Sequence, residues 1–323
     1  MSQIMCVTDM PWMGTGEVPA MPLERDEKSR IEFPIVDPIF DIDGVPVYYT
    51  NSRWCAFVYE ADEKDLKKVL PEPLKLEDDV VEFWYVLHHH TRLGPYYEFG
   101  ITISASYEGY KGGYYPYMYL TSDAGVEAGR VLGFPKKMAF IRVLEHGGKW
   151  DDGIEPPGND YFSFLIARRG YVMHTATGKY SGNKITDLAR LPMFYGKKDW
   201  GRFNYRILSS SDLSETIHQL TFLPSEYEGI HRFQLQMDTI RTAQADDINW
   251  FSQGTPYDNF AAMVPVKKLI GLVSFTFNLI IPAAQVLWTK KVTRSTPEDF
   301  AHCLKAKPYK YGMAHRFPKP IGV

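Results

Sequence analysis

Residues 269–288 read LIGLVSFTFNLIIPAAQVLW and contain no charged side chain. A charge-free stretch of this length is long enough to cross a membrane as a helix. Its middle, however, alternates between polar and apolar residues. The polar ones are Ser274, Thr276 and Asn278, and the apolar ones are Val273, Phe275, Phe277 and Leu279. A period of two is typical of a half-buried β-strand, so we expect a strand here and no membrane partner.

Strand patterns recur through the rest of the chain. Runs rich in aromatic and β-branched residues lie at 80–90, 99–107, 114–121, 138–144, 161–167, 171–177, 217–224 and 231–242. Helical patterns are confined to 63–70 and 123–132, and 178–216 is polar with mixed signals. Lys111-Gly112-Gly113 is predicted to be a turn. Many strands at short spacing favour a closed or two-layer antiparallel sheet over βαβ winding.

Composition and charge place the chain in a broad class. It has 323 residues, 45% of them hydrophobic, and a formal net charge of −3. No basic field covers it, so nucleic acid is not an expected partner. Its three cysteines, at 6, 55 and 303, are too far apart for a disulfide framework or a cysteine-rich metal site. Together with the lack of a signal-peptide pattern in residues 1–16, this predicts a cytoplasmic protein.

The chain is expected to form one main domain. Residues 1–40 are rich in proline, methionine and acidic groups without a clear period, which is typical of an N-terminal arm. Residues 41–291 carry all the strand patterns and form the predicted domain. Residues 292–323 are predicted to be a C-terminal tail. No internal repeat or linker divides the domain further.

Three consecutive histidines, His88-His89-His90, raise the question of a metal site. On a strand, His88 and His90 share one face and His89 takes the other. Two ligands on one face still need a third, and no nearby Asp, Glu or Cys has a suitable spacing. We therefore expect no metal, and histidines that are structural or line a pocket.

Two adjacent lysines, Lys136 and Lys137, lie between apolar residues: Phe134-Pro135 before them and 138–141 (MAFI) after them. Burying an ammonium group there is costly and favours the neutral amine, which is a nucleophile towards ketones. On a strand the two side chains leave on opposite faces, with the ammonium groups about 10 Å apart. Their repulsion is then only about 1.7 kcal/mol, against the roughly 4.6 kcal/mol needed to bring a lysine near neutrality. Desolvation should therefore dominate, with Lys137 secondary.

Several stretches, in order, resemble the acetoacetate decarboxylase family. They are FVY at 57–59, LKKVLPEPL at 66–74, GPYYEFG at 94–100, MYL at 118–120, Gly129-Arg130 with Pro135-Lys136-Lys137, and 264–287. The resemblance covers about residues 45–290. It implies a closed antiparallel β-barrel with flanking helices, in the mainly β or α+β class. It also implies an apolar pocket, a homo-oligomer and a small-molecule oxo-acid substrate, without a cofactor.

The resemblance also implies roles for individual residues. Lys136 matches the lysine that forms an imine with the substrate, Lys137 assists it, and Glu98 is the carboxylate of the site. Met118, Trp84 and Tyr97 are expected at the substrate, and the rings of Tyr96 and Tyr119 enrich the same wall.

Two positions depart from the family pattern. The family has an arginine before the FVY strand that handles the substrate carboxylate, and Ser52 takes that place, with Arg53 one position later. A shift of one position on a strand places a side chain on the opposite face. Arg53 can therefore bind the substrate carboxylate only if a bulge turns it toward the pocket. Arg130 is a weaker candidate for the same role. Trp84 stands where the family carries a second carboxylate. A larger or more aromatic substrate than acetoacetate suits these changes.

The leading hypothesis is therefore a carbon–carbon lyase, a Schiff-base decarboxylase that converts a 3-oxo acid to a ketone and carbon dioxide. Two alternatives stay open. One is a Schiff-base aldolase-dehydratase acting on a 2-oxo acid such as pyruvate. The other is a non-catalytic relative that binds a small ligand.

Overall fold

The structure is a computed structural model that describes residues 45–145, 161–184, 200–212 and 214–293. The predicted arm (1–40) and all but the first two residues of the predicted tail (292–323) lie outside the described residues. The proposed division of the chain into arm, domain and tail therefore stays a prediction.

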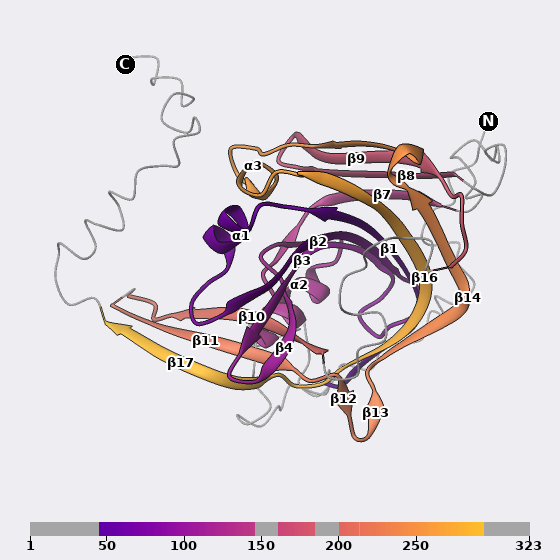
Figure 1. Ribbon diagram of the computed structural model, residues 1–323. Helices are drawn as coiled ribbons and strands as arrows, with labels where there is room; N and C mark the ends of the chain where they lie inside the picture. Colours follow the sequence, from indigo (N-terminus) through magenta and orange to yellow (C-terminus); the bar gives the residue numbers. More distant parts are fainter. Residues whose placement is uncertain (1–44, 146–160, 185–199, 213, 294–323) are drawn as a thin grey trace, which may run out of the picture. The chain divides into compact units, whose positions relative to one another are not determined.

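Most of the described chain is β-structure (Figure 1). The large sheet contains β1 (Val47–Glu60), β2 (Lys75–His88), β3 (Tyr96–Tyr107), β4 (Tyr110–Tyr114), β5 (Met118–Leu120), β6 (Lys136–Met138), β10 (Trp200–Ser209), β11 (Glu215–Leu223), β14 (Phe233–Gln244), β16 (Lys268–Ile281) and β17 (Gln285–Thr293). A smaller sheet contains β7 (Phe140–Glu145), β8 (Tyr161–Arg168), β9 (Tyr171–Lys179) and β15 (Ile248–Ser252). The short pair is β12 (Glu226–Tyr227) with β13 (Ile230–His231), and the helical elements are α1 (Glu63–Val69), α2 (Asp123–Leu132), η5 (Ala245–Asp247) and α3 (Phe260–Met263).

The predicted closed antiparallel barrel is wrong. The 11-stranded sheet runs in the order β14-β16-β1-β2-β3-β4-β10-β11-β17, and its end strands β14 and β17 are not paired with each other. The sheet also branches, because β3 pairs with β4 over one part of its length and with β5 over another. Two pairings, β4 with β10 and β5 with β6, are parallel. Within the described residues the sheets are therefore open and mixed, although the mainly β prediction holds.

The charge-free stretch at 269–288 forms strands, as its alternation predicts, but two of them. β16 ends at Ile281, and Pro282 separates it from β17, which begins at Gln285. Proline cannot donate to a ladder of hydrogen bonds, so it ends the first strand. β16 pairs with β1 and β14, whereas β17 pairs with β11 at the far end of the sheet. None of the helices in the described ranges is long and apolar enough to cross a membrane.

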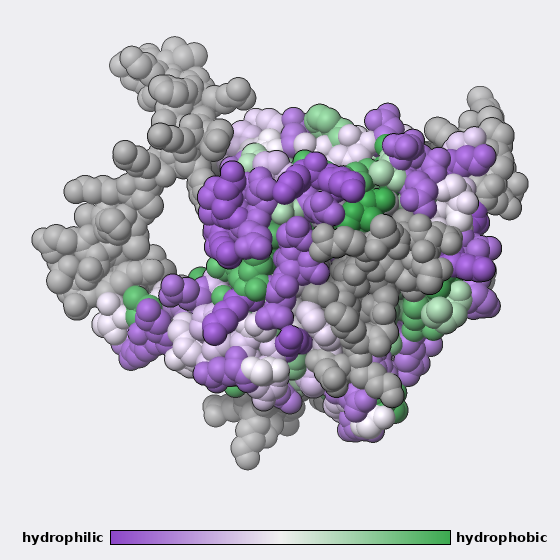
Figure 2. All heavy atoms as spheres, in the orientation of Figure 1, coloured by the Kyte–Doolittle hydropathy of each residue, from purple (hydrophilic) through white to green (hydrophobic). Residues whose placement is uncertain are grey.

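The two faces of the central strands bury different cores. One face packs against the smaller sheet through Phe57, Phe83, Phe164 and other rings. The opposite face carries Trp54, Trp84 and Phe277 among its apolar residues. Figure 1 shows β7, β8 and β9 at the top of the view, next to β16 and β1. The core that contains Phe57, Phe83 and Phe164 lies between these two sheets. On the face drawn in Figure 2, hydrophilic side chains predominate among the coloured atoms and hydrophobic ones show only in limited areas.

The hairpin between β3 and β4 differs from its prediction. The turn lies at Glu108 and Gly109, which have φ angles of 45° and 87°, and not at Lys111-Gly112-Gly113. Gly112 instead lies inside β4, where an added β-carbon would come within 2.3 Å of the carbonyl oxygen of Gly201. Glycine is therefore needed there for close approach of two strands and not for a turn.

Candidate active site

The register of three short strand segments brings the family-matched residues to one face. β3 pairs with β5 so that Glu98 lies opposite Leu120 and Gly100 opposite Met118. β5 pairs with β6 so that Met118 lies opposite Lys136. Because side chains alternate along a strand, Glu98, Met118 and Lys136 point to the same side of the sheet. All three are buried.

Helix α2 delivers Lys136 to this face. The hydroxyl of Ser122 caps its N-terminus by accepting a hydrogen bond from the amide of Gly125. The helix ends at Gly133, whose φ of 97° turns the chain. β6 then begins, and the Lys136 side chain crosses the helix at Gly129. A β-carbon at residue 129 would come within 2.2 Å of Lys136 Cδ, so only glycine leaves room for this path.

A chain of polar contacts begins at Lys136. Its Nζ lies 3.1 Å from Glu98 Oε1, and both side chains are about 95% buried (4% and 5% exposed). The contact is an ion pair without hydrogen-bond alignment, since Glu98 Oε1 accepts no hydrogen bond from the described residues. Glu98 Oε2 lies 3.4 Å from His88 Nε2, and His88 Nδ1 lies 2.8 Å from Ser52 Oγ. Ser52 and His88 are buried as well.

The electrostatics of this chain favour a charged carboxylate and a neutral imidazole. Burial alone would raise the pKa of Glu98, but the Lys136 charge and the His88 hydrogen bond outweigh it and hold that pKa below its usual value. Burial lowers the pKa of His88, with partial opposition from Glu98. The neutral tautomer protonated at Nε2 satisfies both neighbours, because Nε2–H then donates to Glu98 while Nδ1 accepts from the Ser52 hydroxyl.

An apolar pocket opens above Lys136 and Glu98. Its walls include Trp54, Trp84, Tyr115, Phe134, Phe277 and Met118. Trp54 and Trp84 stack with ring centroids 4.7 Å apart. The Trp84 indole donates to Thr102 Oγ1 at 2.8 Å and lies over Gly100, where a β-carbon would collide with the ring at 2.0 Å. Two of the predicted substrate residues, Met118 and Trp84, thus line the same pocket as Lys136.

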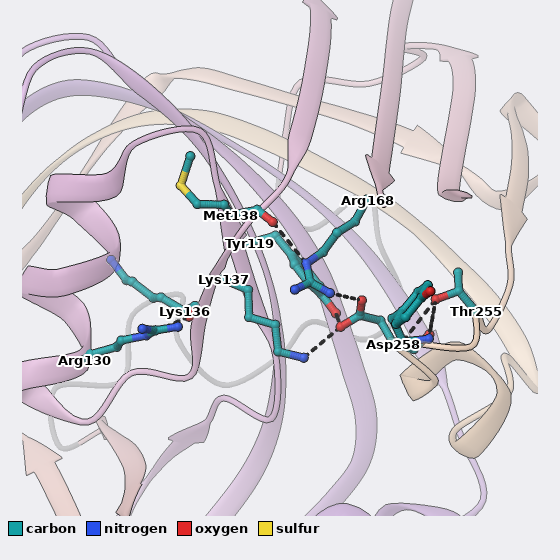
Figure 3. A network of polar contacts seen from close by, with 9 residues as sticks. Tyr119, Arg130, Lys136, Lys137, Met138, Arg168, Thr255 and Asp258 are labelled. Atoms are coloured by element: carbon teal, nitrogen blue, oxygen red, sulfur yellow. Dashed lines mark hydrogen bonds and ion pairs between the residues drawn. The ribbon is translucent and has the colours of Figure 1, made fainter. Parts of the chain in front are cut away.

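Lys137 points to the opposite side of the sheet (Figure 3). Its Nζ lies 2.7 Å from Asp258 Oδ1, and Arg168 Nη1 lies 2.6 Å from the other carboxylate oxygen. The Tyr119 hydroxyl donates to Asp258 at 2.9 Å. Burial alone would raise the pKa of Asp258, but Lys137 and its other partners hold it below its usual value. Lys137 is therefore part of an ion-pair network away from the pocket.

The other sequence-predicted residues that do not line this pocket are Arg53, Tyr97, Arg130, Tyr96 and Tyr119. Arg53 and Tyr97 border a second cavity on the other face of the sheet. Arg53 Nη1 lies within 3.4 Å of Thr239 O and Thr276 Oγ1. A bulge in β1 lies between Tyr49 and Ser52, before Arg53, and leaves Ser52 on the pocket face. Arg130 is half-exposed and holds the Lys136 carbonyl oxygen through Nε, at 3.3 Å.

The pocket also contains residues that the sequence reasoning missed. Arg202 and Arg232 line it together with Lys136. Arg202 belongs to the stretch with mixed signals, and Arg232 begins a predicted strand, so no local pattern marks either residue. In the sequence, Ser52 stands out only as the residue that replaces the family's arginine. In the structure, its hydroxyl forms a hydrogen bond with His88. Parity does place His88 on the pocket face and His89 on the other, where it borders the second cavity.

Comparison with known proteins identifies similar chains. The family model described as Acetoacetate decarboxylase (ADC) matches residues 33–290. The acetoacetate decarboxylase of Clostridium acetobutylicum is 35% identical over 124 residues, which are 38% of this chain and 50% of the relative. Acetoacetate decarboxylase 3 of Mesorhizobium japonicum is 31% identical over 122 residues, 37% and 47% of the two chains. The matched segments thus span about half the length of these relatives.

Solved structures share the fold over more of the chain. A structure titled as an acetoacetate decarboxylase aligns with a TM-score of 0.61 and 23% identity, over 80% of this chain and 96% of the other. A complex of the enduracididine biosynthesis enzyme MppR with the condensation product of pyruvate and imidazole 4-carboxaldehyde aligns with a TM-score of 0.61 and 13% identity, over 80% and 95%. At these identities the likeness concerns the fold.

Proposed function

The chain belongs to the acetoacetate decarboxylase family, and on that premise we propose that it is a Schiff-base decarboxylase of a 3-oxo acid, with Lys136 as the nucleophile. The observation that carries the proposal is the buried Lys136–Glu98 pair, 3.1 Å apart at the base of an aromatic pocket. A buried lysine that lies beside a proton acceptor and lines an apolar pocket is the arrangement that imine formation needs.

The reaction begins with a proton transfer from Lys136 to Glu98. The neutral amine attacks the ketone carbon of the substrate, and loss of water gives a cationic imine. The bond between the α-carbon and the carboxylate then breaks, and its electron pair moves to the imine nitrogen as carbon dioxide leaves. Protonation of the enamine and hydrolysis release the ketone and the free lysine. Each step keeps Lys136 as the only covalent partner.

Glu98 is the group proposed to move protons in these steps. Its Oε1 faces Lys136 and is free of hydrogen bonds from the described residues, while Oε2 is held by His88. His88 is in turn held by Ser52. His88 and Ser52 are therefore positioning residues, which hold the Glu98 carboxylate in place.

The pocket walls support a substrate larger than acetoacetate. Trp54 and Trp84 form a stacked pair on one wall, and Tyr115 meets Trp84 edge-on with ring centroids 5.8 Å apart. Flat apolar surfaces of this kind favour an extended apolar or aromatic body next to the oxo group.

Aldol chemistry on a 2-oxo acid is the second candidate. Of the described residues that line the pocket, Glu98 is the only carboxylate. By resemblance, Trp84 stands where the family carries a second one. A second carboxylate would crowd the departing carboxylate of a 3-oxo acid, so its replacement fits a substrate that keeps its carboxylate. MppR, a fold neighbour, is described in complex with a condensation product of pyruvate.

Release of carbon dioxide distinguishes the two candidates. The wild-type chain is incubated with acetoacetate, with a 3-oxo acid that carries a phenyl group, and with pyruvate plus an aromatic aldehyde. The proposal predicts carbon dioxide and ketone from a 3-oxo acid, and none from Lys136→Ala or Lys136→Arg. A condensation product from pyruvate without carbon dioxide would replace the decarboxylase with the aldolase-dehydratase. No product from any mixture would favour a ligand-binding relative.

A further inference from the structure

Two arginines lie in the pocket that contains Lys136. Arg202 comes from β10, and Arg232 lies between β13 and β14. Lys136 comes from β6, on the branch of the sheet that leaves β3. The two arginines thus reach the pocket from other parts of the fold than the proposed nucleophile does.

Arg232 is fixed in place by backbone groups. Its Nε donates to Pro224 O, its Nη1 donates to Ile280 O at 2.9 Å and its Nη2 donates to Leu223 O at 3.4 Å. A guanidinium has five N–H groups, so two of them are left for another acceptor. No carboxylate of the described residues forms an ion pair with Arg232, although the residue is only 5% exposed. The side chain is held rigidly and still has hydrogen-bond donors to offer.

Arg232 keeps its positive charge although it is buried. Burial, followed by the charge of Arg202, lowers the pKa of Arg232 to about 9, so it stays cationic at neutral pH. Both arginines act on the Tyr115 hydroxyl, and so does the buried Glu82. Arg232 itself has no carboxylate partner among the described residues. An uncompensated buried charge is costly, and an anion that enters the pocket would neutralise it.

A carboxylate held by these arginines is one that the reaction keeps. Carbon dioxide is neutral, whereas the departing carboxylate is charged. Two guanidinium groups on that carboxylate would stabilise the substrate more than the transition state and would slow its loss. They suit instead a second carboxylate that is unchanged by the chemistry at Lys136.

We propose that Arg202 and Arg232 bind a retained carboxylate, and that the substrate is a 3-oxo diacid whose apolar chain lies along the stacked Trp54 and Trp84. This inference rests on the proposed function. The imine forms at the 3-oxo carbon, and the neighbouring carboxylate leaves as carbon dioxide. A solvent proton replaces it on the α-carbon, and hydrolysis gives an oxo monoacid that still carries the carboxylate bound to the arginines. No oxidant or other co-reactant is needed.

Binding of carbonyl-free diacids tests the anion site independently of the chemistry. Linear dicarboxylates from butanedioate to octanedioate, and the matching monocarboxylates, are titrated by calorimetry into the wild type, Arg232→Gln, Arg202→Gln and Arg206→Gln. Arg206 lies on the same strand as Arg202 but does not line the pocket. At least one diacid should bind the wild type and Arg206→Gln, and should bind about tenfold or more weakly to each of the other two variants.

Turnover then tests the substrate class. With the chain length that binds best, the 3-oxo diacid should exceed the matching 3-oxo monoacid in kcat/KM by about tenfold or more in the wild type. Arg202→Gln should remove that preference by lowering kcat/KM for the diacid to the level of the monoacid. Arg232 donates hydrogen bonds to three carbonyl groups, so Arg232→Gln could fail to fold. In that case Arg202→Gln alone decides the test.

The outcomes separate the two proposals. Arginine-dependent diacid binding without turnover of any 3-oxo acid would support the anion site and overturn the decarboxylase. Turnover of the monoacid and diacid at equal rates, unchanged in Arg202→Gln, would overturn the retained-carboxylate inference and leave the decarboxylase intact. Absence of arginine-dependent binding by every diacid in the series would also overturn the inference.

Discussion

The side chain of Lys136 lies against Gly129 so closely that a β-carbon there would come within 2.2 Å of Lys136 Cδ. The glycine and the lysine are seven positions apart and are joined by the end of α2 and the turn at Gly133. A single contact thus links the Gly129-Arg130 motif to the Pro135-Lys136-Lys137 motif. It gives a physical reason for a glycine at position 129 when the lysine is at position 136.

Gly129→Ala should therefore displace Lys136 from Glu98. The added methyl group meets the middle of the lysine side chain, so the amine shifts while the helix itself gains up to about 1 kcal/mol in propensity. We expect imine formation to slow by about tenfold or more, with the thermal stability little changed. The measurement is the rate of borohydride-trapped adduct, read by intact mass.

Gly125→Ala is the matched control on the same helix. Its β-carbon would meet the end of the Leu120 side chain at 2.5 Å and has no contact with Lys136. Adduct formation should stay near that of the wild type. Equal rates for Gly129→Ala and the wild type would show that the lysine does not depend on this contact.

His88→Phe should move the pH profile. The hydrogen bond from His88 helps to hold the pKa of Glu98 below its usual value. Its loss raises that pKa, so Glu98 becomes protonated at higher pH and can no longer accept the lysine proton. The acidic limb of kcat/KM against pH should shift to higher pH. His89→Phe, on the neighbouring residue that borders the other cavity, should leave the limb in place; a shift in both variants or in neither would contradict the role of His88.

Lys137→Ala should lower the stability of the fold and have little effect on imine formation at Lys136. The substitution removes the ion pair of 2.7 Å with Asp258, which keeps its contacts with Arg168 and Tyr119. Because the Lys137 side chain is one-third exposed, we expect a loss of about 1 kcal/mol in the free energy of unfolding. Urea unfolding measures this loss, and the borohydride adduct should remain. Loss of the adduct in a folded variant would show that Lys137 acts directly on Lys136.

His174 should make the fold sensitive to acid. It lies among rings that include Phe83 and Trp250, and neither ring nitrogen has a hydrogen-bond partner in the described part of the chain. Burial lowers its pKa in the folded state to about 3, from 6.5 when exposed. The unfolded chain therefore binds the proton first, and stability falls as the pH drops below 6.5, by up to about 1.4 kcal/mol per pH unit.

His174→Phe tests that dependence. The free energy of unfolding is measured by urea between pH 7.5 and pH 4.5 for both proteins. The wild type should lose more stability than the variant over this range, with the difference growing below pH 6.5. Parallel curves would show that His174 does not titrate on unfolding.

Local sequence patterns predicted much of the fold. Polar and apolar positions alternate in β16, which predicts its strand. The enrichment in aromatic and β-branched residues predicts the strands near 80–90 and 99–107. Sheet closure was predicted from resemblance and is wrong, because β14 and β17 end the sheet without pairing with each other. Contacts between distant segments decide such pairing, and local sequence does not record them. The same limit applies to β10, which lies in the stretch of mixed signals.

The alternation of side chains along a strand explains why some of the predicted site residues do not face the pocket. Glu98 and Tyr97 are neighbours on β3, so only one of them can face the pocket, and it is Glu98. Ser52 and Arg53 differ in the same way on β1. Arg202 and Arg232 could not be found from the sequence, because their meeting depends on how distant strands fold together.

The central claim is that Lys136 forms the imine. Wild type and Lys136→Ala are incubated with acetoacetate, pyruvate and the best-binding 3-oxo diacid, reduced with borohydride, and analysed by intact mass and peptide mapping. The account predicts an adduct on Lys136 that is absent from Lys136→Ala. Its mass is that of the substrate, or of the ketone left after loss of carbon dioxide, minus water plus two hydrogens. An adduct on another lysine, or none with any of the three acids in folded protein, would contradict it.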